Sequence, residues 1–448
     1  MNIIDIIEKK KQGAVLTGEE IAYFIANYVS GEIPDYQISA LLMAIYFQGM
    51  TDTEIFDLTM AMLHSGETLN LSNLPGITAD KHSTGGIGDK VTLILAPLWA
   101  ATGLTVAKMS GRGLGHTGGT IDKLESIPGF NASLSQDAFL TLARQQKIAI
   151  TSQGKELVPA DKLLYALRDV TATVDSLPLI ASSVMSKKLA TGCDVLVLDV
   201  KYGCGSFMKT KAAAKELALA MVKIGEKAQR KVAAVLSPMN CPLGLAVGNS
   251  LEVLEAVEVL SGGGSRALRQ AVVTIAAVGY YLAGLCSTLP AGVELAQRGL
   301  SDGSALAVFK EFVHNQGGQV AKGDFSQALA LSAQRTEVKS PASGYINSIN
   351  ALTIGCVAMD LGAGRRELGD AIDHGAGVLL RKEPGDIVKE GDIIAVLYGD
   401  RSQADLEALA AKTTAAFLIT QDNRLPAETT ELIYRDVVTD ITDLAQFT

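Results

Sequence analysis

The densest group of residues that could do chemistry lies between positions 80 and 125. This stretch contains two glycine-rich turns, in DKHSTGGIGDKVT and AKMSGRGLGHTGGTIDKLE, which alternate with serine, threonine and lysine. Glycine lets backbone amides approach an anion closely, hydroxyl groups donate further hydrogen bonds, and ammonium groups balance the anion's charge. The stretch is net positive, with five basic against four acidic residues, in a chain of net charge −9. These features predict a cradle for a phosphate-type anion.

Neither turn has the spacing of a dinucleotide-binding fingerprint or a P-loop. Any single glycine here would also suit an ordinary turn, so the prediction depends on both turns together with their hydroxyl and lysine side chains. Two histidines fall in the stretch. His82 lies between Lys81 and Ser83 and is predicted to act as a hydrogen-bond donor or general acid, whereas His116 is interpreted as an ordinary satisfied polar residue.

The whole chain has the composition of a large globular protein. It has 448 residues, 48% hydrophobic and 19% charged, which excludes disorder and predicts two to four structural units. The net charge of −9 argues against nonspecific binding to nucleic acid or an anionic membrane. Five scattered cysteines without metal or redox spacing, and an amino terminus without the order of a signal peptide, predict a cytoplasmic protein. The uncharged stretch 271–293 is interpreted as a buried helix followed by a turn.

Several kinds of element must position these residues. The first 65 or so residues are predicted to be helical, with capping boxes at Thr17/Glu20 and Thr51/Glu54. From about residue 77, short aliphatic runs alternate with amphipathic stretches, which is typical of an α/β layer with buried parallel strands. Helix stops are expected at Gly13, Gly31 and Gly49, strands over 103–109, 194–200 and 231–236, and a helical insert over 160–190.

After about residue 336 the pattern changes to alternating strands around paired turns at Gly385 and Gly391. This part resembles the hammerhead of biotinyl and lipoyl carrier domains, but no lysine lies at the hairpin apex in a Met-Lys-Met-like setting. We therefore interpret it as a structural appendage. The predicted fold is a helical lobe plus a large mixed α/β lobe with a barrel-sandwich-like α+β region. The expected limits are 1–70 with 160–193, 71–159 with 194–335, and 336–448.

The sequence also resembles a known family. SGRGLGHTGGTIDKLE at 110–125 is similar to the signature of thymidine and pyrimidine-nucleoside phosphorylases. Further blocks follow the same family in order, namely DKHSTGGIGD at 80–89, ADKLLYALRDVTATVDSLPLIASSVMSKKLA at 160–190, DVKYGCGSFM at 199–208 and LGAGR at 361–365. The resemblance implies reversible phosphorolysis, in which a pyrimidine nucleoside and inorganic phosphate give the free base and a pentose 1-phosphate.

The resemblance also assigns residues. It implies phosphate contacts from Lys81, Ser83, Thr92, Lys108, Ser110 and Thr120, and base contacts from Tyr165, Arg168, Ser183 and Lys187, with His82 between the two groups. Breaking the glycosidic bond leaves negative charge on the base, so Arg168 and Lys187 suit the leaving group, and bound phosphate suits the cationic sugar. The two groups come from distant segments, which predicts a cleft that closes between lobes.

One position departs from the family. The resemblance implies that Gly88, Leu243, Ala246 and Glu255 hold a potassium-type or calcium-type cation, but the family's threonine ligand is Lys90 here. Either the Lys90 ammonium takes the place of the ion and no metal cofactor is required, or Lys90 is simply exposed to solvent. The resemblance implies inorganic phosphate as the co-substrate.

Several alternatives stay open. A narrow thymidine phosphorylase shares the signature, although the overall match favours the broad type that accepts uridine, thymidine and deoxyuridine. An anthranilate-type phosphoribosyltransferase is a more distant rival that would need magnesium, and a noncatalytic carrier would need a lipoyl or biotin group. The amino-terminal helices are expected to form a homodimer interface, as the family implies, or to serve only as an intrachain lobe.

Overall fold

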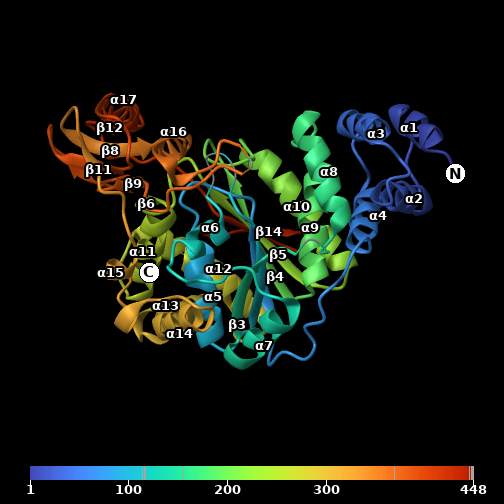
Figure 1. The fold of residues 1–448 in the computed structure, drawn as a ribbon, viewed down its shortest axis with the longest axis horizontal. Coiled ribbons are helices and arrows are strands. Elements are labelled where there is room, and N and C mark those ends of the chain that lie inside the picture. The colour runs from blue at the N-terminus through green and yellow to red at the C-terminus, as the bar shows by residue number, and fades with distance from the viewer. Residues whose placement is uncertain (114, 116–117, 155, 368, 443, 445–448) are drawn as a thin grey trace.

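The computed structural model describes residues 1–113, 115, 118–154, 156–367, 369–442 and 444. Figure 1 shows three parts in a row, with the amino-terminal helices (blue) at one end, the carboxyl-terminal sheets (orange to red) at the other, and an α/β lobe between them. This arrangement confirms the predicted fold class. The expected domain limits remain a prediction.

The amino-terminal helices form a lobe with two helices from the middle of the chain. Both predicted capping boxes are present, so Thr17 and Thr51 each accept a hydrogen bond from the backbone of the glutamate three residues later. The insert returns to this lobe, where α9 packs along α4. The helices are α1 (Ile3–Lys11), α2 (Gly18–Val29), α3 (Asp35–Gln48), α4 (Asp52–Leu63), α8 (Pro159–Val170) and α9 (Leu177–Thr191).

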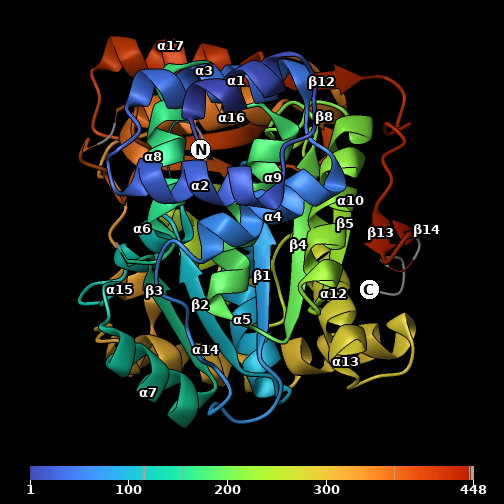
Figure 2. The same cartoon turned by 90° about the vertical axis from the view of Figure 1, so that its right-hand side faces the viewer.

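The α/β lobe is built on a parallel sheet that is buried on both faces. Its strands are β1 (Ala79–Ser83), β2 (Val106–Ser110), β3 (Ile148–Ser152), β4 (Val195–Tyr202) and β5 (Lys231–Pro238). A parallel bridge between Thr78 and Thr105 joins the β2–β3 pair to β1, and Figure 2 shows β3, β2, β1, β4 and β5 side by side. Along β4, Val197 points into one apolar core and Leu196 into the other, which includes the amino-terminal helices. The predicted strands are thus confirmed, each within a few residues.

Helices cover the two faces of this sheet. They are α5 (Val91–Ala101), α6 (Thr120–Glu125), α7 (Gln136–Gln146), α10 (Lys211–Lys227), α11 (Asn249–Leu260), α12 (Arg266–Ala283), α13 (Leu289–Ser301), α14 (Ser304–Asn315) and α15 (Phe325–Ala328), with a short 3-10 turn at Ala321–Gly323. The uncharged stretch 271–293 forms most of α12, which ends at the left-handed Gly284, and the start of α13. This confirms a buried helix followed by a turn. Within the described residues, no helix has the length and apolar character needed to cross a bilayer.

The carboxyl-terminal region holds two small antiparallel sheets. Their strand orders are β10 (Ile387–Val388), β8 (Gly344–Ile349), β12 (Phe417–Thr420) and β6 (Ala246–Gly248), β9 (Gly377–Leu380), β11 (Ile393–Tyr398), β7 (Arg335–Lys339). Two helices, α16 (Ala351–Ala358) and α17 (Gln403–Thr414), and a π turn at Met359–Ala363 complete it. Because β6 comes from the α/β part, the second sheet joins the two regions.

The last two strands of the chain differ from expectation. β13 (Glu431–Tyr434) pairs antiparallel with β5, and β14 (Val437–Asp440) pairs with β13, so residues grouped by sequence with the carboxyl-terminal region extend the central sheet. The alternation of a strand shows which face is buried but does not show which sheet edge it joins.

Candidate active site

A cavity of about 290 Å³ lies where the carboxyl ends of β1 and β2 meet helix α9. Eight of the residues assigned from the sequence line it, namely Lys81, His82, Ser83, Thr92, Lys108, Ser110, Thr120 and Lys187. Its described lining has five cationic side chains, Lys81, Lys108, Arg112, Lys187 and Lys188, and one carboxylate, Asp89. The cavity is therefore suited to an anion.

The first glycine-rich turn follows β1 and leads into the amino terminus of α5. The backbone NH of Gly85 donates to Ser83 Oγ at 3.2 Å, and Gly85 has the left-handed φ of +93° that favours glycine. Thr92 lies in the first turn of α5, where unpaired backbone NH groups and the helix dipole favour a negative charge. The turn thus brings a hydroxyl group and a helix end to the same side of the cavity.

The second turn brings β2 and α6 to the opposite side. Ser110 is the last residue of β2, and Thr120 is the first residue of α6. A side chain at Gly119 would place its Cβ 2.2 Å from the backbone nitrogen of Gly113, so only glycine lets these two backbone segments lie so close together. His116 lies outside the described residues.

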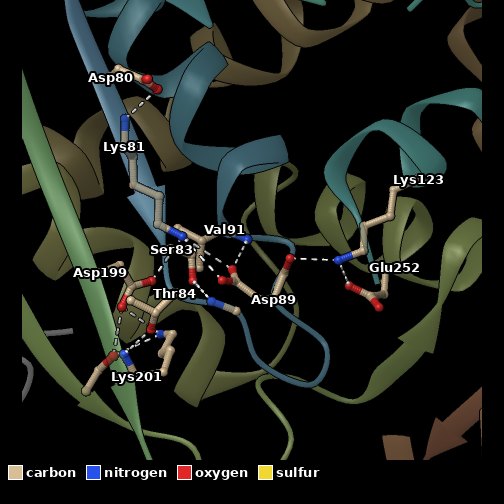
Figure 3. Close-up of polar contacts among 12 residues, drawn as sticks. Asp80, Lys81, Ser83, Thr84, Asp89, Val91, Lys123, Asp199, Lys201 and Glu252 are labelled. Atoms are coloured by element: carbon tan, nitrogen blue, oxygen red, sulfur yellow. Dashed lines mark hydrogen bonds and ion pairs between the residues drawn. The ribbon is translucent and has the colours of Figure 1, made fainter. Parts of the chain in front are cut away.

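Lys81 is held by two carboxylates, as Figure 3 shows. Its ammonium lies 3.0 Å from Asp199 and 3.4 Å from Asp89. Burial alone would lower the pKa of Lys81, but these two carboxylates outweigh it and raise the pKa above its usual value. Asp199 also accepts hydrogen bonds from Lys201 at 2.9 Å and Ser237 at 2.8 Å. Lys81 is therefore charged at neutral pH, and its two carboxylate partners hold its position.

Asp80 links strand β2 to helix α9 of the helical lobe. Its two oxygens accept from Lys108 at 2.9 Å and from Lys188, on α9, at 2.8 Å, and all three side chains are buried. Burial pushes the pKa of Asp80 upward, and the two ammonium groups outweigh it, so the carboxylate stays ionised. Burial, only partly offset by Asp80, lowers the pKa of Lys108 to about 8.

His82 lies among three ammonium groups. Burial lowers its pKa well below the usual value, and the charges of Lys188, Lys108 and Lys187 lower it further. The imidazole is therefore neutral at pH 7, so it can donate one hydrogen bond but holds no extra proton to transfer.

The base-side residues are arranged differently. Lys187 reaches the cavity and donates to Asp161 at 2.6 Å and to Ser183 at 3.2 Å. Arg168 is buried and directs its donors to the backbone carbonyls of 173, 174 and 179 at 2.6–3.2 Å. Tyr165 is 43% exposed and lies against the Arg168 guanidinium, 5.7 Å from ring centroid to Cζ. Of the four predicted base contacts, the structure thus brings Lys187 to the cavity and leaves Tyr165, Arg168 and Ser183 off its described lining.

Lys90 lies at the centre of the group of residues that the family resemblance assigns to a cation. Its fully buried ammonium donates to the carbonyls of Leu243 and Ala246, both at 2.8 Å, and to Glu255 at 2.6 Å. Gly88 borders the same point, because a Cβ there would lie 3.4 Å from the Lys90 nitrogen. Because the Lys90 ammonium fills the space between these oxygens, no room is left there for a metal cation. The alternative of a solvent-exposed Lys90 is wrong.

Sequence reasoning predicted Glu255 as a partner of Lys90 but missed two other carboxylates that hold lysines. The net positive charge of 80–125 is offset by Asp199, which pairs with Lys81, and by Glu252, which lies 2.7 Å from Lys123 (Figure 3). They come from β4 and α11, more than 70 residues further along the chain, so a local charge count cannot find them. Asp199 begins the block DVKYGCGSFM, so the family resemblance includes this residue without assigning it a role.

Sequence reasoning also missed a contact from the carboxyl-terminal region. Arg365 donates to Asp122 at 2.8 Å and to the Gly113 carbonyl at 3.2 Å, and its own carbonyl accepts from the Gly115 NH at 2.8 Å. Asp122 also accepts from the Gly113 NH at 2.6 Å. The region interpreted as an appendage therefore braces the second glycine-rich turn, and the LGAGR block was the available signal.

Comparisons with known proteins match this architecture part by part. Residues 4–66 match the glycosyl transferase family helical bundle domain, residues 76–306 its a/b domain, and residues 345–419 the pyrimidine nucleoside phosphorylase C-terminal domain. The chain is 50% identical to a pyrimidine-nucleoside phosphorylase of Geobacillus stearothermophilus and 51% identical to one of Bacillus subtilis. Each match covers 90% of this chain and 94% of the relative. The chain belongs to the pyrimidine-nucleoside phosphorylase family.

A solved structure shows how far this family's fold extends. Anthranilate phosphoribosyltransferase from Thermus thermophilus superposes with a TM-score of 0.57 at 21% identity, covering 69% of this chain and 98% of that one. At this identity the match shows a shared fold alone. The pyrimidine-nucleoside phosphorylase family has an additional carboxyl-terminal domain, and in this member that domain contacts the phosphate-loop side through Arg365.

Proposed function

We infer that this member of the family catalyses reversible phosphorolysis of pyrimidine nucleosides, giving the free base and ribose or deoxyribose 1-phosphate. One observation carries this inference. A single cavity joins Lys81 and Lys108, which suit a phosphate dianion, to Lys187 on the other lobe, which suits the departing base. Inorganic phosphate is the co-substrate.

The proposed mechanism uses charge placed at both ends of the breaking bond. Phosphate held by the two glycine-rich turns stabilises positive charge on the sugar and attacks C1′. The electron pair of the C1′–N bond passes to the base, where Lys187 stabilises the negative charge. Arg168 joins it once its donors leave the backbone carbonyls that hold them. We propose that closure of the lobes brings Tyr165, Arg168 and Ser183 to the substrate.

We propose that His82 acts as a neutral hydrogen-bond donor to the base or sugar. Its depressed pKa means that the proton required for release of a neutral base comes from solvent rather than from an imidazolium. Activity is therefore expected to show no inflection near pH 6.5 that His82→Asn removes. Such an inflection in the wild type, lost in His82→Asn, would assign proton transfer to the histidine.

The proposed substrate range is broad, covering uridine, thymidine and deoxyuridine. The test compares kcat/KM for uridine and thymidine under one set of conditions, with anthranilate and a phosphoribosyl pyrophosphate donor as a further pair. Ratios within about tenfold for the two nucleosides support the broad enzyme. Turnover of thymidine alone supports the narrow alternative, and turnover of anthranilate would refute the phosphorylase assignment.

We propose that no metal cofactor is required, because the Lys90 ammonium supplies the positive charge. Lys90→Thr leaves Glu255 and the carbonyls of Leu243 and Ala246 free to bind an ion. We expect potassium chloride, compared with choline chloride, to raise the Tm of this variant by roughly 2–4 °C and to leave the wild-type Tm unchanged.

The matched control for this test is Lys123→Thr. Lys123 is a second buried lysine that pairs with a glutamate of α11, namely Glu252, and it also donates to the backbone carbonyl of Asp89. Its replacement therefore also leaves a buried glutamate and a carbonyl without their cation. We expect this variant to lose stability without gaining a response to potassium. A potassium response of the wild-type Tm would refute the proposal for Lys90.

We propose a homodimer through the helical lobe. Tyr36 and Phe47 on α3 and Val170 on α8 are each more than 70% exposed, and so large an exposed apolar set favours a protein partner. Light scattering on the wild type and Phe47→Lys tests this. A wild-type monomer would refute it.

We also propose a cytoplasmic location. All five cysteines are free thiols, as expected of a reducing compartment. Fractionation of the source cells tests this, and recovery outside the cytoplasmic fraction would contradict it.

A further inference from the structure

Behind Lys187, off the described lining of the cavity, lies a buried carboxylate that the proposed mechanism does not use. Asp161 lies in the first turn of α8 and is 5% exposed. One of its oxygens accepts from Lys187 at 2.6 Å. The other, Oδ1, is buried and has no hydrogen-bond partner among the described residues.

Among the described residues, Lys187 is the only hydrogen-bond partner of the Asp161 carboxylate. Removing one partner of a buried ion pair is strongly destabilising, because the remaining charge is left without solvation. Lys187 therefore cannot leave Asp161 to follow the substrate without a large cost. The ion pair is expected to persist while the base binds, reacts and leaves.

The direction of the remaining Lys187 donor follows from this constraint. A lysine ammonium has three N–H groups, and here Asp161 and Ser183 accept two of them. The side chain is 23% exposed and lines the cavity, so the third N–H is the one available to a ligand.

Asp161 also acts on the second cation of the base site. Asp161 and Arg168 are seven residues apart on α8, which places them on one face of that helix. Burial lowers the pKa of Arg168, and the charge of Asp161 is the first interaction that opposes it. One carboxylate thus serves two cations.

We propose that Asp161 is a positioning residue for phosphorolysis, a fixed counterion that aims the Lys187 ammonium at the leaving base. This inference rests on the proposed function, since it assumes that Lys187 contacts the pyrimidine. It assigns to Asp161 no contact with substrate.

The test uses Asp161→Asn, which keeps the shape and removes the charge. We expect kcat/KM for uridine to fall by roughly 10- to 100-fold, the loss typical of a charge-assisted hydrogen bond. The phosphate KM is expected to change by less than about twofold. Asp161→Glu, which keeps the charge, is expected to retain more activity than Asp161→Asn. Equal losses for uridine and phosphate, or a fully active Asp161→Asn, would overturn the proposal.

The matched control is Asp137→Asn. Asp137 is also an aspartate in a first helical turn, that of α7, but it is exposed. It therefore controls for loss of a favourable charge at a helix amino terminus, and its kinetics are expected to match the wild type.

A double-mutant cycle with Lys187→Ala separates positioning from a general structural role. Uracil affinity is measured by calorimetry in saturating phosphate. Adding Asp161→Asn to Lys187→Ala is expected to cause no further loss of uracil affinity and to raise the Tm, because the orphaned carboxylate is removed. A further loss of uracil affinity would overturn the proposal. Phosphorolysis of uridine by the wild type is measured alongside, and its absence would refute the proposed function instead.

Discussion

The proposed phosphate half and the proposed base half of the site differ in how far they are assembled. On the phosphate side, Lys81 and Lys108 are paired with buried carboxylates and face one cavity together with the hydroxyl groups of both turns. On the base side, Lys187 alone of the predicted contacts reaches that cavity, while Arg168 is bonded to its own lobe. The ionic network fixes one half, whereas the proposed movement of the lobes would complete the other.

The two halves differ in how the donors that stabilise charge are held in place. Both a bound dianion and a leaving group that becomes charged during reaction are stabilised best by donors that are already in place. Asp161 holds Lys187 in place in this way, whereas the donors of Arg168 must first leave the backbone carbonyls that they contact. Asp80 connects the two halves, because it binds Lys108 of the phosphate side and Lys188 of helix α9.

The largest expected effect separates the two halves at Lys187. Lys187→Ala should reduce kcat for uridine by roughly 1000-fold or more, because it removes the cation that faces the leaving base. Phosphate affinity, measured by calorimetry, should change by less than about threefold. Lys162→Ala, an exposed lysine on α8, is the control. Wild-type-like turnover in Lys187→Ala would refute the assignment.

A smaller loss is expected when the brace on the second turn is removed. Arg365→Met breaks the contacts to Asp122 and the Gly113 carbonyl and should raise the phosphate KM by about tenfold. Its neighbour Arg366 is 70% exposed and pairs with Asp360, so Arg366→Met should have little effect. Equal effects of the two changes would mean that the carboxyl-terminal region does not support the phosphate half.

The phosphate half should also respond to pH through Lys108. Its pKa of about 8 lies below the usual value, so the ammonium loses its charge, and with it part of its affinity for phosphate, as the pH rises through 8. We expect the phosphate KM to rise up to about tenfold between pH 8 and 9. Lys108→Arg, which stays charged, should remove this rise. A flat KM up to pH 9.5 in the wild type would contradict the prediction.

The smallest effect concerns the order of binding. If the phosphate half is preassembled, phosphate should bind the free protein, and uracil should bind roughly fivefold more tightly once phosphate is present. Calorimetry with each ligand alone and then in sequence measures this coupling. Equal uracil affinity with and without phosphate would remove the distinction between the halves.

The same contrast explains what could be predicted from the sequence. Both glycine-rich turns, the capping boxes and the buried parallel strands depend on local residue patterns, and the structure contains them. The partners of the lysines depend on which strands and helices become neighbours. Asp199 lies opposite Ser83 only because β4 pairs with β1, and Glu252 reaches Lys123 only because α11 packs against α6.

Arg168 illustrates a different limit. Its sequence position and the family resemblance assign it to the base, but its hydrogen bonds to the carbonyls of residues 173, 174 and 179 depend on the turn between α8 and α9. A motif identifies such a residue but does not predict the conformation of its side chain in the protein without substrate.

The pairing of β13 with β5 has a consequence for synthesis on the ribosome. The outer edge of β5 is complete by residue 238, yet the strand that covers it arrives almost two hundred residues later. An uncovered strand edge can pair with another chain. During much of translation, the nascent chain therefore exposes the unpaired edge of β5, to which a chaperone can bind.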